Sequence, residues 1–132
     1  MGTPVMIAIY LWANALLYAV FSVLCSLKLS TTSQSMGFLS LDRGGRSEFL
    51  TVYGGMELGL ALMFAWMAWR PVLNRTGLAI ALLIYAPIVA FRLIGWIRLW
   101  PVQRTTLATG LLEIALLLIG LALWFALRPS AG

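Results

Sequence analysis

Residues 52–59 read VYGGMELG and place an ionisable side chain, Glu57, inside an apolar stretch that continues to Trp69. At about 1.5 Å per residue, a helix over this stretch is long enough to cross the hydrocarbon core of a bilayer. A carboxyl group within such a helix is costly unless it has a partner, so it indicates a structural ion pair or a functional site. We therefore expect the rest of the chain to supply partner side chains at the depth of Glu57.

The composition indicates an integral membrane protein. Hydrophobic residues make up 62% of the 132 residues and charged residues only 10%, against roughly 25% charged in soluble domains. A chain of this length could not bury so much apolar surface in water. The apolar residues form long runs, which predict membrane spans at about 5–27, 49–69, 78–99 and 107–127. We expect a single integral membrane domain over residues 1–132, an all-α membrane protein folded as an antiparallel four-transmembrane-helix bundle with 28–48 as its long loop.

The charged residues and the cysteine limit the partners. The formal net charge is +5, and most Lys and Arg residues stand at the edges of the apolar runs. Cations at these edges contact lipid headgroups, so we expect the lipid bilayer as a partner and no nucleic acid. With a single cysteine and no histidine, the chain has no internal disulfide and no histidine-based metal or haem site. We expect no metal and no cofactor.

The distribution of Lys and Arg also predicts the topology. Four antiparallel spans place both termini on one side of the membrane. The side of the long loop carries Lys28, Arg43, Arg46, Arg98 and Arg104, and the side of the termini carries Arg70, Arg75 and Arg128. Because Lys and Arg are enriched in cytoplasmic loops, the termini are predicted to lie outside.

Polar residues recur at every fourth position of the first span, at Tyr10, Asn14, Tyr18 and Ser22. This spacing places them in one stripe on a single helix face. A lipid-facing asparagine would be costly, so the stripe is predicted to face the interior of the bundle. Interhelical hydrogen bonding is the favoured role, and lining a ligand cavity is the alternative.

Three charged residues fall at similar depth below the side of the long loop. At about 1.5 Å per residue, Glu57 lies about 12 Å, Arg92 about 10 Å and Glu113 about 9 Å from that side. An isolated charge there costs about 2.5–3.5 kcal/mol, and an arginine between two carboxylates offsets much of this cost. We therefore predict a buried Glu57–Arg92–Glu113 cluster. Its surplus negative charge requires a protonated glutamate or a further partner, which could be Tyr53, Tyr85, Asn14 or a bound cationic group.

Glycines near both glutamates predict close helix packing, at Gly54, Gly55, Gly59 and Gly110. Gly54 precedes Glu57 by the same spacing as Gly110 precedes Glu113. A glycine at this spacing shares the face of the glutamate and makes room beside it. The match suggests two helical hairpins related by a pseudo-two-fold axis along the membrane normal.

The long loop contains a second candidate site. Arg43 and Arg46 flank Gly44 and Gly45, and glycines free backbone N–H groups to form a concave anion-binding nest. A solvated turn whose charges serve the topology is the favoured alternative. Residues 36–41 are amphipathic and are expected to lie on the membrane surface or to cap the bundle.

Residues 46–49 (RSEF), followed by 52–60 (VYGGMELGL), resemble the signature of a small four-helix bacterial membrane family. That family is catalogued as a domain of unknown function, near the DoxX-like group. Arg92 and the spacing of Gly110 and Glu113 also fit its pattern. The resemblance implies a four-helix fold in the bacterial inner membrane, and it brings no established activity.

Three functions remain open at this point. The favoured one is an accessory or structural subunit of a membrane assembly, in which the ion cluster fixes the helix register against other membrane subunits or a second copy. The alternative is a site for a lipophilic small molecule (a lipid, quinone or isoprenoid), with Glu57 and Glu113 as candidate catalytic acid and base. The third is proton or small-solute transport. Whether the protein is an enzyme is left undecided.

Overall fold

The computed structural model describes residues 2–127, and every regular element in that range is helical. In chain order they are α1 (Thr3–Leu27), α2 (Leu29–Ser35), α3 (Arg43–Phe49), the π-helical segment η1 (Leu50–Met56), α4 (Glu57–Trp69), the 3₁₀ turn η2 (Pro71–Leu73), α5 (Asn74–Leu99) and α6 (Arg104–Ala126). The predicted all-α class is confirmed.

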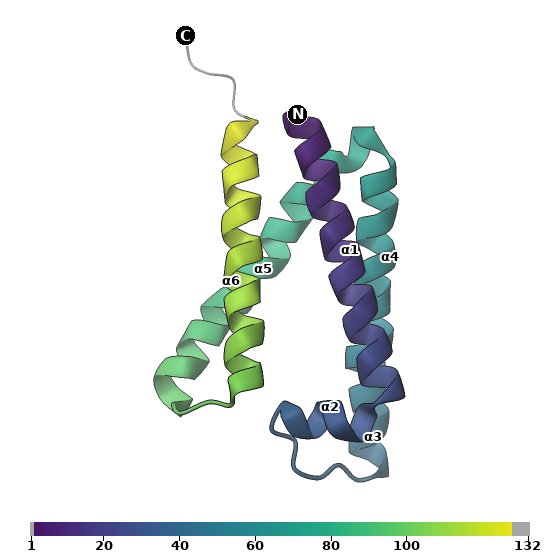
Figure 1. The fold of residues 1–132 in the computed structure, drawn as a ribbon, viewed down its shortest axis with the longest axis vertical. Helices are drawn as coiled ribbons and strands as arrows, with labels where there is room; N and C mark the ends of the chain where they lie inside the picture. The colour runs from purple at the N-terminus through teal and green to yellow at the C-terminus, as the bar shows by residue number, and fades with distance from the viewer. Residues whose placement is uncertain (1, 128–132) are drawn as a thin grey trace.

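Four helical stretches of the described chain are long and apolar enough to cross a membrane: Thr3–Leu27, Arg43–Trp69, Pro71–Leu99 and Arg104–Ala126. They pack as an antiparallel bundle (Figure 1). The outer surface is apolar, with Leu83 on α5 74% exposed and Ile97 83% exposed, as contact with lipid requires. The protein is a small polytopic membrane protein, as the composition predicted.

The second membrane helix begins well before the predicted residue 49. The side chain of Asp42 accepts a hydrogen bond from the backbone N–H of Gly45 at 2.7 Å and caps the first turn of α3. Asp is among the preferred N-cap residues, because its carboxylate satisfies one of the free N–H groups at a helix start. Together with the short helix α2, this turns most of the expected long loop into helix.

The bundle consists of two hairpins. Within the described chain, α1 packs mainly along η1 and α4, and α5 packs mainly along α6. The hairpins approach each other at the end that carries the N-terminus and diverge toward the end that carries α2 and α3 (Figure 1). We call these the terminus end and the loop end. The contact at one end and the divergence at the other decide where the protein can hold a ligand.

Glycines allow the close approach at the terminus end. A Cβ atom on Gly77 would lie 2.8 Å from Leu11 Cδ1, and a Cβ atom on Gly120 would lie 2.9 Å from the hydroxyl oxygen of Tyr10. Such separations are shorter than van der Waals contact, so a larger residue would push the helices apart. The Tyr10 hydroxyl also donates a hydrogen bond to the carbonyl of Leu116 at 2.9 Å, which ties α1 to α6.

The polar stripe of α1 faces the interior, as predicted. Asn14 is fully buried, its Nδ2 donates to the carbonyl of Tyr10 at 2.8 Å, and its Oδ1 accepts a hydrogen bond from the hydroxyl of Tyr85 on α5. Ser22 is also buried, and its Oγ donates to the carbonyl of Gly54 in η1 at 2.7 Å. Interhelical hydrogen bonding is therefore the role of most of this stripe.

The glycine prediction is correct for some positions and wrong for others. A Cβ atom on Gly54 would lie 2.7 Å from Ser26 Oγ, and one on Gly110 would overlap the ring of Trp96. At Gly55 and Gly59, by contrast, an added Cβ atom meets nothing within 4 Å. The difference arises because neighbouring residues of a helix point in different directions. Gly54 faces α1, so the other two glycines lie on the outer face of the hairpin.

Exchange of Gly110 and of Gly59 for alanine separates these two environments. Gly110→Ala should lower the free energy of unfolding by about 1–3 kcal/mol, because the added methyl group overlaps a packed ring. Gly59→Ala adds the same methyl group in open space and should be neutral or stabilising by up to about 1 kcal/mol. Reversible unfolding in mixed micelles measures both. Equal effects of the two substitutions would contradict the packing described here.

Candidate functional site

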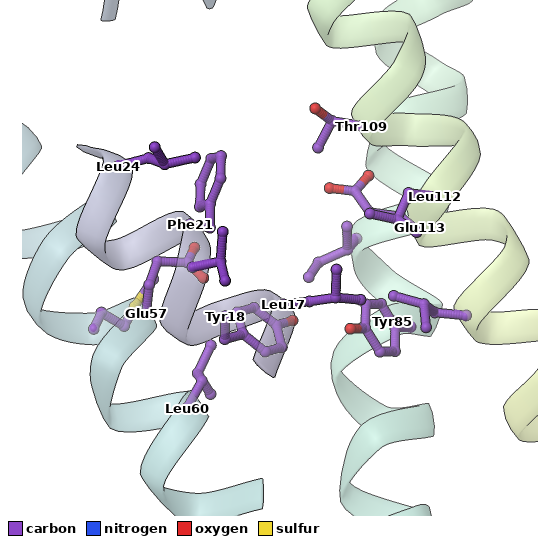
Figure 2. Close-up of a pocket in the computed structure, with 14 residues that line it drawn as sticks. Leu17, Tyr18, Phe21, Leu24, Glu57, Leu60, Tyr85, Thr109, Leu112 and Glu113 are labelled. Atoms are coloured by element: carbon purple, nitrogen blue, oxygen red, sulfur yellow. The ribbon is translucent and has the colours of Figure 1, made fainter. Parts of the chain in front are cut away.

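The divergence of the hairpins leaves a cavity of about 310 Å³ toward the loop end. Its walls are mostly apolar and come from both hairpins, including Leu17, Phe21 and Leu24 of α1, Leu60 of α4, and Leu112 and Leu116 of α6. Polar groups line it at a few positions: Tyr18, Glu57, Tyr85, Thr109 and Glu113. Figure 2 shows these side chains around the open space between the hairpins.

Glu57 and Glu113 lie on opposite walls of this cavity. Glu57 projects from the start of α4 and Glu113 from α6, and both side chains line the open space between the hairpins (Figure 2). The two glutamates, which the sequence placed at similar depth, therefore line the same cavity. They face each other across a space and do not share a partner.

The predicted Glu57–Arg92–Glu113 cluster is wrong. Arg92 pairs with Glu113 alone, through Nε to Oε2 at 2.8 Å and through a terminal guanidinium nitrogen to Oε1 at 2.6 Å. The two side chains are 27% and 15% exposed. Both residues belong to the α5–α6 hairpin, and Glu57 belongs to the other. Because the hairpins diverge at this depth, Arg92 satisfies the carboxylate on its neighbouring helix and leaves Glu57 on the far wall.

Glu57 is therefore half-buried and outside the ion pair. Its Oε2 atom is buried and has no hydrogen-bond partner among residues 2–127. A buried polar atom without a partner carries a desolvation cost that no interaction offsets, and the cost is greater for a group that can ionise. In a structure whose other buried polar side chains are largely satisfied, this position invites a ligand group.

The π-helical segment η1 directs Glu57 toward the cavity. Glu57 is the first residue after this segment. A π-helical turn holds more residues than an α-helical turn, so it rotates the following residues relative to those before it. The hydrogen bond from Ser22 to the carbonyl of Gly54 fixes the segment against α1. Single π-helical turns within α-helices are frequent at functional sites.

Two tyrosines form the floor of the cavity. The ring of Tyr18 stacks on that of Phe64 with centroids 5.8 Å apart, and on that of Tyr85 at 6.5 Å. The hydroxyl of Tyr85 donates to Asn14, which lies outside the cavity lining and holds the Tyr85 ring in place. Of the partners predicted for the glutamates, Tyr85 thus lines the site, and Asn14 orients it.

Tyr53 was predicted as a further partner and lies elsewhere. Its ring packs against Phe49 with centroids 4.6 Å apart, and against Phe21 and Phe38 at 6.4 Å each. Through Phe49 this aromatic cluster joins a small core that also contains Cys25 and Leu29. Tyr53 does not line the cavity, because its ring packs into this aromatic cluster instead. Met36 and Leu41 also pack on this core, so the amphipathic stretch 36–41 caps the bundle in part.

Sequence analysis missed Tyr18 and Thr109 as residues of the site. Tyr18 belonged to the polar stripe of α1, but its stripe neighbours are satisfied by protein groups and it faces the cavity. Thr109 lies one helical turn before Glu113 on the same face of α6. That spacing could have identified Thr109 from the sequence. Its hydroxyl donates to the carbonyl of Thr105 at 2.9 Å, so its oxygen can still accept a hydrogen bond from a ligand.

The predicted anion site at residues 43–46 is not supported. Gly44 and Gly45 lie in the first turn of α3, and the carboxylate of Asp42 accepts the N–H of Gly45 that an anion would need. Arg46 donates to the hydroxyl of Ser30 at 3.1 Å and so links α3 to α2. The two glycines begin a capped helix, and the carboxylate of Asp42 already occupies the place that an anion would take.

Comparison of the chain with protein-family models, with curated proteins and with solved structures found no match. The resemblance of residues 46–60 to a bacterial family near the DoxX-like group therefore stays a prediction. In the described part of the chain, no group of three or more His, Cys, Asp or Glu residues could hold a metal ion. The cavity and its polar groups are therefore the features that indicate a function.

A double-mutant cycle tests the pairing. Arg92→Gln and Glu113→Gln should each destabilise the protein, and the double variant should be less destabilised than the sum, with a coupling of about 0.5–3 kcal/mol. The coupling of Arg92 with Glu57, measured through Glu57→Gln, should be smaller because no hydrogen bond joins these residues. Unfolding in mixed micelles gives both values. A larger coupling for Glu57 would restore the three-residue cluster.

Proposed function

We propose that the protein binds a lipophilic small molecule within the membrane, in the cavity between its two hairpins. The observation that carries this proposal is Glu57, which lines an otherwise mostly apolar cavity and whose buried Oε2 atom has no hydrogen-bond partner in the described chain. Packing alone gives no reason for such a group, whereas a binding site does. An intramembrane ionisable residue is by default a candidate for function.

The cavity has the size and lining expected for a small ligand. Its volume of about 310 Å³ falls at the lower end of the range of roughly 300–1,000 Å³ for small-molecule sites. Such sites combine apolar walls with a few polar groups that orient the ligand. Here Glu57, Tyr18 and Thr109 supply those groups.

The cavity is also reachable from lipid. Leu24 of α1 and Leu112 of α6 line it from opposite hairpins, and each is 44% exposed. Both helices are membrane spans, so this opening faces the hydrocarbon region. A ligand dissolved in the bilayer would enter between α1 and α6 without crossing water.

The ion pair no longer favours a structural or accessory subunit. In that hypothesis, three charges joined separate helices and fixed their register. The bond between Arg92 and Glu113 joins helices that are already consecutive in the chain, and it leaves the two hairpins unlinked at the loop end. Other membrane subunits, or a second copy of the chain, stay predictions from the sequence.

Binding is also better supported than catalysis or transport. Acid–base catalysis by the two glutamates needs two free carboxyl groups, and both oxygens of Glu113 accept hydrogen bonds from Arg92. Transport needs a path through the bundle. At the terminus end the described chain is tightly packed, with Leu11, Phe64 and Leu78 completely buried.

Filling the cavity tests the proposal. Leu17→Trp places a large ring in the cavity, and Leu16→Trp places the same ring on the exposed lipid-facing side of α1. The protein in phosphatidylcholine nanodiscs should bind a neutral probe, neopentylbenzene, saturably, as measured by saturation-transfer NMR. Leu17→Trp should weaken this binding at least tenfold, which is about 1.4 kcal/mol, and Leu16→Trp should leave it unchanged. Equal binding by both variants, or none by the unmodified protein, would contradict a ligand site.

A further inference from the structure

The charges around the cavity are unbalanced. Both Glu57 and Glu113 line it, and Arg92 compensates Glu113 through two hydrogen bonds. No Lys or Arg of the described chain is among the residues that line the cavity. Glu57 is thus left without a compensating charge, and a ligand with a negatively charged head would meet a carboxyl group and no cation.

Aromatic side chains line the same space. Tyr18, Phe21 and Tyr85 line the cavity, with the rings of Tyr18 and Tyr85 stacked 6.5 Å apart. The face of an aromatic ring carries negative charge density and attracts a cation within about 6 Å of its centroid. A carboxyl group and several aromatic rings lining one cavity are the chemistry that recognises organic ammonium groups.

On the basis of the binding function proposed above, we propose that the ligand is a lipophilic organic cation. It consists of an apolar body that fits the leucine-lined walls and an amine or quaternary ammonium group that lies against Glu57 and the rings of Tyr18 and Phe21. Fatty acids and other anionic lipids are selected against, since the lining offers their headgroup no positive charge.

Glu57 is the residue that confers this selectivity. The side chain lines the cavity (Figure 2), and its buried Oε2 atom lacks a partner in the described chain. An ammonium group would supply the missing partner, and attraction between opposite charges is far stronger there than in water because the surroundings are apolar. Glu113 cannot take this role while both of its oxygens are bound to Arg92.

A matched set of probes tests the proposal. Benzyltrimethylammonium is a cation, neopentylbenzene has the same shape with carbon in place of the charged nitrogen, and phenylmethanesulfonate is an anion of similar size. Binding of each is measured by saturation-transfer NMR to the protein in phosphatidylcholine nanodiscs, with empty nanodiscs as background. The zwitterionic lipid adds no net charge of its own.

Each probe is compared between the unmodified protein and Glu57→Gln, so that partitioning of the probe into lipid cancels. Glu57→Gln should weaken binding of the cation at least tenfold and change binding of the neutral probe less than threefold. The anion should not bind the unmodified protein. Glu57→Asp keeps the charge on a shorter side chain, so this variant should retain most of the cation binding that Glu57→Gln loses.

Glu48→Gln is the matched control. It removes the same charge from an exposed residue of α3 that does not line the cavity, so binding of all three probes should be unchanged. If Glu57→Gln does not fold, as judged by size-exclusion chromatography, Tyr18→Leu provides a second variant. This substitution removes an aromatic ring and should weaken binding of the cation more than binding of the neutral probe.

The outcomes separate the two proposals. If the neutral probe binds and Leu17→Trp abolishes that binding, the cavity is a ligand site. If, in addition, Glu57→Gln affects cation and neutral probe equally, the preference for a cation is wrong and a neutral ligand remains. Binding of the anion to the unmodified protein would also overturn it. If the neutral probe does not bind the unmodified protein saturably, both proposals fail.

Discussion

The two hairpins are joined at the terminus end, and the cavity depends on that junction. There Gly77 and Gly120 let side chains of α1 approach the backbones of α5 and α6, and the hydroxyl of Tyr10 donates to the carbonyl of Leu116. Buried polar groups in an apolar surrounding are costly when unpaired, so this hydrogen bond holds the helices in a defined relation. Helices that cross closely at one end separate toward the other, and the wedge between them is lined by Glu57 and Glu113.

The two glutamates show how the same residue type takes different roles at similar depth. Glu113 has an arginine on the neighbouring helix of its own hairpin, and the pair satisfies itself with two hydrogen bonds. Glu57 follows a π-helical segment and lines the cavity without a charged partner. The first carboxylate stabilises the α5–α6 hairpin. The second keeps an unsatisfied atom that a ligand can use.

Much of the candidate site was predictable, and the errors have identifiable causes. Helix rise gives the depth of a residue in the membrane, and depth correctly grouped Glu57 with Glu113. Depth does not tell which wall a side chain belongs to, so Arg92 was assigned to both glutamates and pairs with one. The position of Tyr53 was missed for a related reason. The π-helical turn alters the angular relation between Tyr53 and Glu57, and sequence periodicity assumes a regular helix.

The sequence by itself determined the membrane class, the four helices and the inward face of α1, because these follow from the length and periodicity of apolar runs. It also singled out Glu57, Arg92 and Glu113 as candidates, since few ionisable groups lie within the spans. Only the tertiary structure decided which of them are paired, that Gly55 and Gly59 face outward, and that a cavity exists at all. These properties depend on the angle between two hairpins and on one widened helical turn, and both arise from contacts between residues far apart in the chain.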